Sequence, residues 1–442
     1  MSSSPRRAVL VVLSALSLVL TAGAFEPTVA RTEPTSQVQL AIGDPAPDNY
    51  IPKMGVLFNH PFWSNRGQIA THVKRMIRST QPGQSIRIAS FSVGARSIVD
   101  ALIGARNRGV SVQVIGDAHL VDPKNDLYSK GFVRLRRTLG RDKTKSSWVN
   151  VCSNSCRGNG GNLHSKIFLF SQVGGVSNIV VTGSANLTRM AVVGQWNHAR
   201  TVSDPAAYSN LMTVFAQMAA DQPVTPPNVE YNDALGHSWV FPWPAMDALT
   251  DPVMAAMSNV QCTYTDINGV TQRTKIRVNM YTWADERGVW LATRVRQLWD
   301  SGCDVAVLTS IMSRNVRDRL TTRSGRGPIP VKKVGVWDEL GVLVKYNHAK
   351  WLTIQGATFT NPNAAIVVAG SCNFSNLGRY SDEITTTYSS ATDVAAYAAD
   401  FAATWRERYA SRLGPLRVGS NVRIVDEPIE FGKGELKYAE ND

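Results

Sequence analysis

One block of sequence occurs twice in this chain, once in each half. Each copy begins with a His-x-Lys run, continues through an apolar stretch and a turn, and ends in Gly-Ser-x-Asn. The copies occupy residues 163–186 and 347–373. Because a block that recurs with the same internal order indicates duplication, it predicts two similar lobes rather than one irregular domain.

The sequence around the two blocks predicts an α/β fold. Residues 67–77 place apolar side chains on one helical face, residues 86–91 have the pattern of a strand, and a further helix and strand follow by residue 115. In the second half the strand 276–281, a helix and the strand 303–308 keep this order. Strands that alternate with helices predict βαβ units, so each lobe should hold a mixed, mainly parallel sheet flanked by helices.

The lobes are bounded by segments of different composition. We place the first lobe at residues 45–222 and the second at 254–415. Residues 223–253 are rich in proline and tryptophan and predict a linker, in which Ser238–Trp243 is either a membrane-interface element or aromatic packing onto the lobes. Residues 416–442 form an acidic tail.

Residues 1–24 predict an export signal. Arg6 and Arg7 precede an apolar stretch over residues 9–20, and Ala-Gly-Ala at 22–24 supplies small residues for cleavage. A membrane anchor is a weaker interpretation because a bilayer span needs about 20 apolar residues. We therefore expect a secreted, extracellular protein, exported by either the general or the twin-arginine route.

The charge balance of the chain is basic. It carries 47 Lys and Arg against 34 Asp and Glu, a formal net charge of +13, and 43% of its 442 residues are hydrophobic. This composition excludes a disordered tail or a coiled coil, and the charge attracts polyanions such as nucleic acid or anionic lipid head groups. Charge alone does not choose between these partners.

Five cysteines in an exported chain cannot all pair with one another. Cys152 and Cys156 are the pair that we expect to close a local disulfide, and Cys262 and Cys303 form a second candidate pair. Cys372 is left over; it aligns with an alanine of the first block, which predicts a small packed side chain rather than a reactive thiol. No cluster of cysteine and histidine in the sequence supplies the roughly four ligands of a metal site.

The spacing within each block has a physical meaning. In a strand, residues i and i+2 point to the same face, so His164 projects with Lys166 and His348 with Lys350. Either motif alone is usually a solvated strand or an ordinary turn, but their repetition in the same order favours a site for a phosphate group. The two Gly-Ser-x-Asn turns would bring backbone N–H groups, hydroxyls and amides to it, from Ser184, Asn186, Ser371 and Asn373.

At these residues the chain resembles the phospholipase D superfamily, whose signature is a duplicated His-x-Lys-(x)4-Asp motif followed by Gly-Gly or Gly-Ser and Asn. The resemblance implies two pseudo-symmetric lobes with the active site at their interface. The sequence departs from the pattern at the motif aspartate, where Ser171 and Gln355 stand. In the family that aspartate mainly supports local structure, so its loss indicates a divergent branch and does not by itself indicate inactivity.

The resemblance also implies phosphodiester cleavage by two histidines, without a metal or other cofactor. By analogy with the family, His164 is the nucleophile and His348 the general acid and base, although the sequence does not decide which is which. Lys166 and Lys350 would neutralise the nonbridging oxygens, assisted by the serines and asparagines of the two turns.

A later carboxylate commonly orients one histidine in such enzymes. The second lobe offers Asp382 and Glu383, of which we favour Glu383; if it served the histidine of its own lobe, it would favour His348 as the better base. The first lobe has Asn197 at the comparable place, an amide that cannot stabilise imidazolium as a carboxylate would. We expect His198 beside it to be an ordinary surface or packing residue.

The substrate class stays open at this stage. We predict a phosphoric diester hydrolase of the phospholipase D type that acts on phosphatidylcholine-like lipids, with exchange of the head group for another alcohol as a further reaction. A secreted metal-independent nuclease is the alternative, with Trp196 or Trp351 stacking on bases, although Trp351 should face the core. A third interpretation is a phosphodiester-binding protein without catalysis. We expect a monomer that contacts an anionic membrane surface peripherally.

Overall fold

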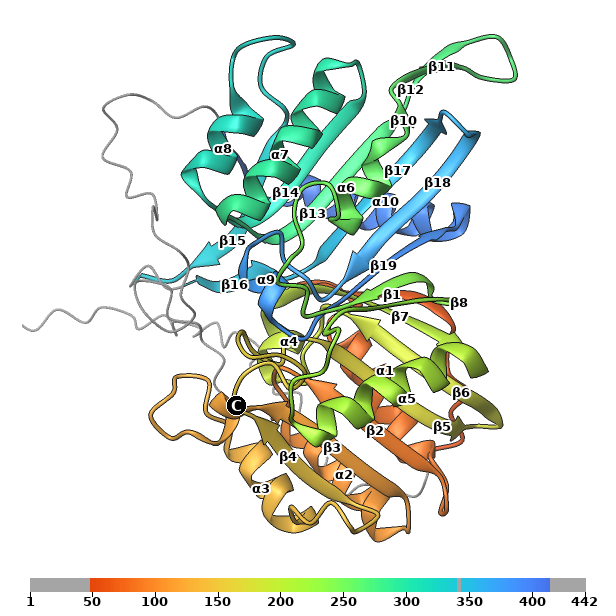
Figure 1. Cartoon of the computed structure of the whole chain (residues 1–442), viewed down its shortest axis with the longest axis vertical. Helices are drawn as coiled ribbons and strands as arrows, with labels where there is room; N and C mark the ends of the chain where they lie inside the picture. Colours follow the sequence, from red (N-terminus) through yellow and green to blue (C-terminus); the bar gives the residue numbers. More distant parts are fainter. Residues whose placement is uncertain (1–47, 340–342, 414–442) are drawn as a thin grey trace, which may run out of the picture. The chain divides into compact units, whose positions relative to one another are not determined.

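The computed structural model describes residues 48–339 and 343–413. The predicted export signal at residues 1–24 and the acidic tail at 416–442 lie outside the described residues. Two sheets covered by helices, joined by one short strand, account for most of the described chain (Figure 1). We call the sheet that begins at residue 55, with its helices, the first lobe, and the sheet that begins at residue 229 the second lobe.

The sheet of the first lobe has the strand order β4-β3-β2-β5-β6-β7-β1. Its parallel strands β2, β3 and β4 are connected through helices, and the remaining pairings are antiparallel. The strands are β1 (Gly55–Asn59), β2 (Ser85–Ser90), β3 (Ser111–Asp117), β4 (Trp148–Cys152), β5 (Lys166–Val173), β6 (Val176–Gly183) and β7 (Gln195–Ser203).

Helices cover both faces of this sheet. The apolar positions predicted for the first helix, among them Ile69, Val73 and Met76, are buried against the sheet. The last helix of the lobe packs on the other face through residues such as Leu211 and Phe215. The helices are α1 (Gln68–Ser79), α2 (Arg96–Asn107) and α3 (Lys130–Leu139) on one face and α5 (Pro205–Ala220) on the other, with the short helix η1 (Ala118–Val121) after β3 and α4 (Arg189–Val193) before β7.

The second lobe repeats this arrangement. Its sheet has the order β20-β15-β14-β13-β17-β18-β19-β9-β8, with β13, β14 and β15 parallel. These strands are β8 (Val229–Asp233), β9 (Gly236–Val240), β13 (Lys275–Trp283), β14 (Asp304–Met312), β15 (Val331–Trp337), β17 (Lys350–Thr358), β18 (Asn361–Gly370), β19 (Ile384–Ser389) and β20 (Ala410–Arg412). The short strands β10 (Val260–Gln261), β11 (Thr263–Thr265) and β12 (Thr271–Arg273) precede β13.

The helices of the second lobe also lie on both faces of its sheet. One face packs against α6 (Pro252–Ser258), α7 (Asp285–Asp300) and α8 (Arg314–Thr321), and the other against α10 (Ala391–Arg406). A short helix, α9 (Leu377–Tyr380), follows β18 as α4 follows β6. Trp351 is buried beneath α10, as its position on the strand predicts.

The prediction of a mixed sheet is confirmed, but the prediction that parallel pairings dominate is wrong. Within each lobe's sheet only the strands joined by crossover helices are parallel; the hairpins β5–β6 and β17–β18, together with the strands beyond them, are antiparallel. The physical reason is the duplicated block itself, because a strand that returns through a short turn must run antiparallel to its partner.

The proline-rich segment between the lobes contains part of the second sheet. Its strand β9 pairs with β19, as β1 pairs with β7 in the first lobe. Trp239 lies on β9, with its ring stacked on His237 at a centroid distance of 3.9 Å. For the part of Ser238–Trp243 that lies on β9, the structure therefore favours packing onto the lobe over an interfacial element.

One short strand joins the two lobes. The strand β16 (Leu343–Asn347) pairs in parallel with β7 of the first lobe and antiparallel with β15 of the second. A second link lies nearby, where Leu163 forms a bridge with Asp382. Both links immediately precede a His-x-Lys motif, so the contact between the lobes and the position of the two histidines depend on the same residues.

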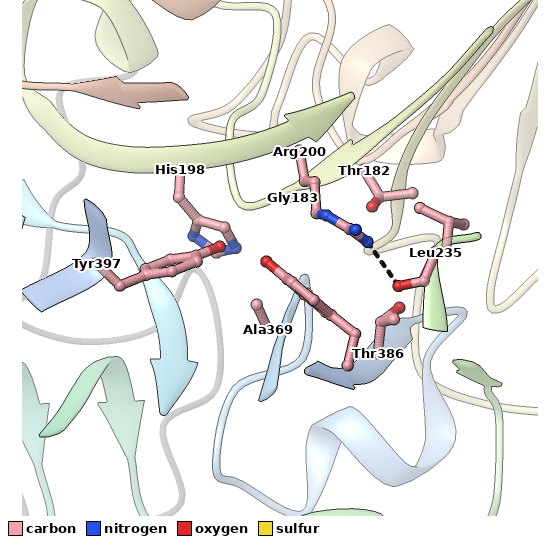
Figure 2. A pocket seen from close by; sticks show the side chains of 10 residues that line it. Thr182, Gly183, His198, Arg200, Leu235, Ala369, Thr386 and Tyr397 are labelled. Atoms are coloured by element: carbon pink, nitrogen blue, oxygen red, sulfur yellow. Dashed lines mark hydrogen bonds between the residues drawn. The ribbon is translucent and has the colours of Figure 1, made fainter. Parts of the chain in front are cut away.

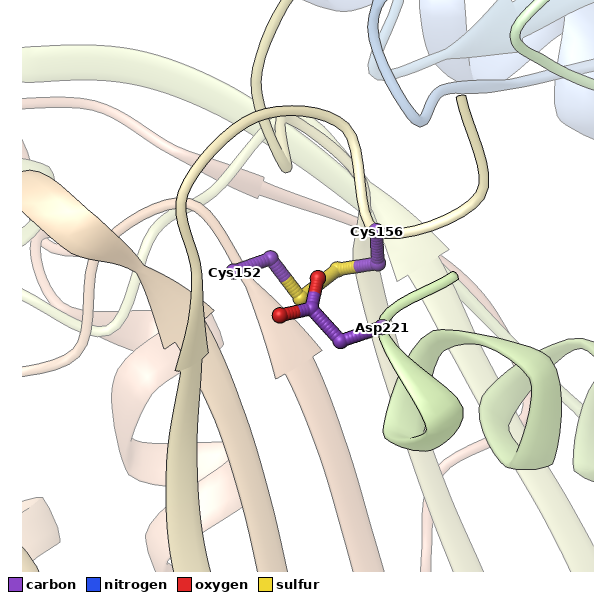
Figure 3. Close-up of side chains that lie close together, drawn as sticks. All are labelled: Cys152, Cys156 and Asp221. Carbon is purple, nitrogen blue, oxygen red and sulfur yellow. A yellow bond between two sulfur atoms is a disulfide. The ribbon is translucent and has the colours of Figure 1, made fainter. Parts of the chain in front are cut away.

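Both predicted disulfides are confirmed. Cys152 pairs with Cys156, Cys262 pairs with Cys303, and Cys372 is a buried free thiol. Figure 3 shows the first disulfide beside the carboxylate of Asp221. These three residues offer ligand atoms within 4.8 Å of one another, but the cysteines are committed to each other and do not supply thiolates to a metal. None of the helices within the described ranges is long and apolar enough to cross a bilayer.

Candidate active site

The two His-x-Lys motifs lie at the starts of equivalent strands. β5 begins at Lys166 and β17 at Lys350, and both histidines and both lysines are buried. Each lysine Nζ donates a hydrogen bond to the backbone carbonyl of the histidine in its own motif, over 2.6 Å in the case of Lys350 and His348. The Gly-Ser-x-Asn turns follow β6 and β18, whose ends lie beside the starts of β5 and β17.

A carboxylate from the second lobe holds the histidine of the first. His164 Nδ1 lies 2.6 Å from Glu383 Oε1, and both side chains are buried. The other carboxylate oxygen of Glu383 accepts a hydrogen bond from the hydroxyl of Ser371, which in turn accepts one from the backbone N–H of Ile384 over 3.1 Å. The acid that the sequence singled out therefore orients the histidine of the opposite lobe rather than its own.

An amide from the first lobe holds the histidine of the second. His348 Nδ1 lies 3.0 Å from Asn197 Oδ1, which also accepts a hydrogen bond from the Ser184 hydroxyl over 2.8 Å. The amide nitrogen of Asn197 donates to Gln195 Oε1 over 3.0 Å, and Gln195 Nε2 donates to the hydroxyl of Tyr346 over 2.6 Å. This chain of bonds fixes which end of the Asn197 amide faces the imidazole.

The partners on Nδ1 set the tautomer of each imidazole. A carboxylate oxygen and an amide oxygen only accept hydrogen bonds, so both His164 and His348 donate from Nδ1. In the neutral form each ring then carries its lone pair on Nε2. This is the atom that can attack phosphorus or exchange a proton with a leaving group.

Burial and neighbouring charges set the protonation states. Burial lowers the pKa of His164 to about 4, against the opposing influence of the Glu383 carboxylate. Burial and the ammonium groups of Lys350 and Lys166 hold the pKa of His348 well below its usual value. Burial alone would raise the pKa of Glu383, but the neighbouring His164 and Lys166 lower it overall. At neutral pH the site therefore contains two neutral imidazoles and one carboxylate.

The two serines of the turns serve the positioning groups. The hydroxyl of Ser184 is bonded to Asn197 and to the backbone N–H of His198, and that of Ser371 to Glu383 and Ile384. Their role in the structure is thus supporting. Asn186 is buried, and its Oδ1 has no hydrogen-bond partner among the described residues. Asn373 Oδ1 accepts from the backbone N–H of Thr282 over 3.4 Å.

Sequence reasoning missed several residues that support the histidines. Gln195 and Tyr346 complete the chain of bonds to Asn197, and Gln195 could have been suspected because it shares a strand face with Asn197. Aromatic rings back the two motifs: Phe91 lies 5.1 Å from the ring of His164, and Tyr281 lies 4.9 Å from that of His348.

Two aspartates at the entrance to the first motif were also missed or set aside. The carboxylate of Asp117 accepts a hydrogen bond from the backbone N–H of Leu163 over 3.1 Å and bonds His119 Nδ1 over 2.8 Å. The carboxylate of Asp382 accepts from the backbone N–H of Cys156 over 2.5 Å, and its carbonyl accepts from the N–H of His164 over 3.0 Å. Neither of these contacts has a signal in the sequence, because both join segments that are far apart in the chain.

The residues that replace the motif aspartates lie away from the histidines, further along the strands. Ser171 accepts a hydrogen bond from the backbone N–H of Ser85 over 2.8 Å and donates to Gln84 Oε1 over 2.7 Å, so it supports the local strand pairing. Gln355 is exposed. Neither substitution removes a group that contacts His164 or His348.

His198 is confirmed as a packing residue. Alternation along β7 turns its ring away from the side on which Asn197 meets His348. It lines a cavity of about 10 Å³, room for one water molecule, together with Tyr397 and Thr386 of the second lobe (Figure 2). Neither ring nitrogen of His198 has a hydrogen-bond partner within the described part of the chain, and burial lowers its pKa to about 3.

Comparisons with known proteins agree with the duplicated motif. Residues 73–219 match the family profile described as "Cardiolipin synthase, PLD-like domain". Residues 73–219 therefore form a phospholipase D-like domain. No curated protein sequence matches it.

Two solved structures resemble this protein over most of its length. Phosphatidylserine synthase from Haemophilus influenzae is 12% identical, with a TM-score of 0.54, over 83% of this chain and 90% of that one. Polyphosphate kinase from Porphyromonas gingivalis is 13% identical, with a TM-score of 0.52, over 81% of this chain. The match spans only 48% of the kinase, about half of its length. At these identities the likeness concerns the fold.

A third solved structure matches a smaller part of the chain. Nuc from Salmonella typhimurium, a phospholipase D family member, is 21% identical, with a TM-score of 0.28, over 37% of this chain and 92% of that one.

Proposed function

We propose that this protein is an exported phospholipase D-type phosphodiesterase, which releases the head group from phosphatidylcholine-like lipids through a phosphohistidine. The observation that supports the proposal most strongly is the crossed pairing of His164 with Glu383 and of His348 with Asn197, each formed between the lobes. Such pairing holds two imidazoles in one place with defined tautomers, which is what a two-histidine displacement requires.

His164 suits the role of nucleophile. Its Nε2 lone pair attacks phosphorus, and the bond from phosphorus to the head-group oxygen breaks as the P–N bond forms. As positive charge develops on the ring, the Glu383 carboxylate 2.6 Å from Nδ1 stabilises it. The carboxylate thus favours His164 as nucleophile, because the phosphohistidine carries the charge that Glu383 can balance.

His348 suits the role of acid and base. Its pKa is held low by burial and by the two lysines, so a bound phosphodiester anion is needed to favour the imidazolium. The imidazolium then gives its proton to the departing alcohol. In the second step the neutral ring takes a proton from water, the resulting hydroxide attacks phosphorus, the P–N bond breaks and both rings return to their initial states. An alcohol in place of water gives head-group exchange.

Lys166 and Lys350 suit the role of charge neutralisation. Both are buried beside the histidines, and both influence the protonation of His348. Two ammonium groups in a site of low polarity stabilise the charge on nonbridging phosphate oxygens more strongly than they would in water. Every step in this scheme uses side chains of the chain itself, so we expect activity in the presence of EDTA.

A secreted nuclease remains the second candidate because the net charge of +13 favours any polyanion. Trp196, one of the two rings that the nuclease interpretation would stack on bases, is buried at 2% exposure, and Trp351 is buried at 1%, as expected for a ring that faces the core. Because bases cannot stack on these two rings, a lipid substrate is favoured over nucleic acid.

The deciding experiment incubates the purified protein in EDTA with phosphatidylcholine vesicles and, separately, with plasmid DNA. We expect choline release without nicking. Nicking without choline release would support the nuclease. If neither reaction occurred, the interpretation as a phosphodiester-binding protein without catalysis would remain. His164→Ala and His348→Ala should each reduce turnover by orders of magnitude while circular dichroism stays unchanged; near-normal turnover in either variant would overturn the two-histidine scheme.

A further inference from the structure

A compact group of aromatic and basic side chains lies at the end of the first lobe that carries the catalytic turns. Phe62 and Trp63 are each 38% exposed, and Arg66 and Arg189 are exposed as well. Lys345 joins them, with its Nζ 5.1 Å from the centroid of the Phe62 ring. We call these five residues the cationic-aromatic surface. They come from three segments: the loop before α1, the helix α4 and the strand β16.

The basic groups of this surface lie close enough to repel one another. Burial and the nearby guanidinium groups of Arg66 and Arg189 lower the pKa of Lys345. The Lys345 ammonium donates to the carbonyl oxygen of Val193 over 3.1 Å, and the charged groups that lower its pKa are the two cations Arg66 and Arg189. Positive charge concentrated in this way attracts an anionic partner.

The aromatic residues are presented on a rigid loop. Asn59 Oδ1 accepts from the N–H of Gly67 over 2.5 Å, and Asn59 Nδ2 donates to the carbonyl of Gln195 over 2.6 Å, so both ends of the loop are tied to α4 and β7. Gly67 has φ 74°, a conformation in which a side chain would be strained. The loop therefore holds two large apolar rings partly in water, a cost that a partner surface can relieve.

The cationic-aromatic surface borders the active site. β1 runs in the same direction as β6, so the loop after β1 and the first Gly-Ser-x-Asn turn emerge at the same end of the sheet. Asn59 is the strand partner of Asn197, which bonds His348. Along β16, Tyr346 faces the site and Lys345 faces the opposite side. The surface is thus beside the reacting groups without lining them.

The equivalent position in the second lobe has a different chemistry. Its loop after β9 carries an exposed acid, Asp247, whereas the first loop carries the exposed Arg66; Asp251 at the end of that loop is buried and paired with Arg287. Arg379 lies on α9, the short helix equivalent to α4, and is 3.6 Å from Glu286. Among the residues that the structure describes, exposed basic groups are therefore concentrated on one side of the site, which distinguishes a docking surface from general basicity.

We propose that the cationic-aromatic surface docks the protein onto an anionic phospholipid bilayer, with the rings of Phe62 and Trp63 at the level of the head groups. The proposal rests on the proposed lipid substrate. Aromatic rings beside lysine and arginine match the apolar-polar boundary and the negative charge of such a surface. Nucleic acid fits less well, because the faces of the rings are partly covered: Phe62 stacks on Tyr409 at 4.5 Å and Trp63 on His60 at 3.6 Å.

The test measures co-sedimentation with vesicles of phosphatidylcholine, with and without phosphatidylglycerol, for the full protein. Arg66→Gln/Arg189→Gln is compared with Arg106→Gln/Arg137→Gln, which removes two exposed arginines from the far ends of α2 and α3. Each docking arginine should contribute about fivefold to binding of the anionic vesicles, so the first variant should lose about 25-fold and the second almost nothing. Phe62→Ser/Trp63→Ser should also weaken binding.

A water-soluble diester, bis(p-nitrophenyl) phosphate, separates docking from catalysis. We expect Arg66→Gln/Arg189→Gln to hydrolyse it as the unaltered protein does. Equal vesicle binding by the two arginine variants would overturn the docking proposal, and so would binding to plasmid DNA in place of vesicles. Vesicle binding without hydrolysis of any diester would instead overturn the proposed function and leave the docking surface standing.

Discussion

His164 Nδ1 and Glu383 Oε1, which belong to different lobes, lie 2.6 Å apart in the buried centre of the molecule. The reciprocal contact between the lobes joins His348 Nδ1 to Asn197 Oδ1 over 3.0 Å. Each lobe thus supplies one histidine and the positioning group of the other histidine. Neither lobe contains a complete site, so separation of the lobes would remove the orientation of both imidazoles at once.

Replacing the carboxylate of Glu383 by an amide should lower kcat by about 10- to 100-fold with little change in KM. In Glu383→Gln the amide oxygen can still accept a hydrogen bond from His164. The NH2 group then faces the Ser371 hydroxyl, which in the unaltered protein donates to the carboxylate oxygen at that position. The charge that would balance the proposed phosphohistidine is lost. Steady-state kinetics on a soluble diester measure the effect, with Glu230→Gln, which alters the partly exposed pair of Glu230 and His237, as the matched control. Unchanged kcat in Glu383→Gln would remove the positioning role.

Introducing a carboxylate on the other side of the site should shift the pH profile. Asn197→Asp places a negative charge beside His348 Nδ1, which favours the imidazolium and raises the pKa of His348. The general acid then stays protonated to higher pH, so the alkaline limb of kcat should move up by about one pH unit. Asn232→Asp makes the same charge change at an exposed position on β8. If both variants kept the original alkaline limb, His348 would not be the acid.

The sequence predicted the elements of this fold well because their signals are local. The helical face of Ile69, Val73 and Met76, the hairpins of the duplicated block and the Cys152–Cys156 disulfide follow from short-range pattern and spacing. The majority of antiparallel pairings was not predicted, because alternation of helices and strands describes only those strands that a helix connects. The strand β9 was hidden in a proline-rich segment, since its pairing with β19 depends on residues far along the chain.

The site residues also fall into those that a local sequence signal predicts and those whose contacts depend on distant segments. His164, Lys166, His348 and Lys350 were predictable because the motif repeats, and Glu383 and Asn197 because they follow it at similar distances. The crossing of the two positioning groups was not predictable, since it depends on how the lobes face each other. For the same reason the contacts of Gln195, Tyr346 and Asp382 were not predicted, although their bonds hold the positioning groups in place.

The two disulfides should affect activity and stability in opposite order. The loop of Cys152–Cys156 holds Asp382, the neighbour of Glu383, through the N–H of Cys156, whereas Cys262–Cys303 joins the start of the second lobe to β14. In the chain-entropy account a 41-residue separation stabilises by about 4 kcal/mol and a 4-residue separation by about 2. Cys152→Ser/Cys156→Ser should therefore lower kcat more and Tm less than Cys262→Ser/Cys303→Ser. Calorimetry and kinetics on both variants test this; equal effects on kcat would disconnect the loop from the site.

Buried neutral histidines should make the protein sensitive to acid. Burial lowers the pKa of His72 to about 4, while in the unfolded chain the imidazole keeps its usual value of 6.5. Between these two values the unfolded state binds the proton and the folded state does not, so the free energy of unfolding falls as pH drops from 6.5 to 4, by at most about 1.4 kcal/mol per pH unit for one histidine. His72→Gln, which can keep a bond to Tyr50 or Thr201, should flatten the fall in denaturant midpoint over this window, whereas His237→Gln, on the exposed part of β9, should not. Equal slopes in all three proteins would show that His72 already carries its proton when folded.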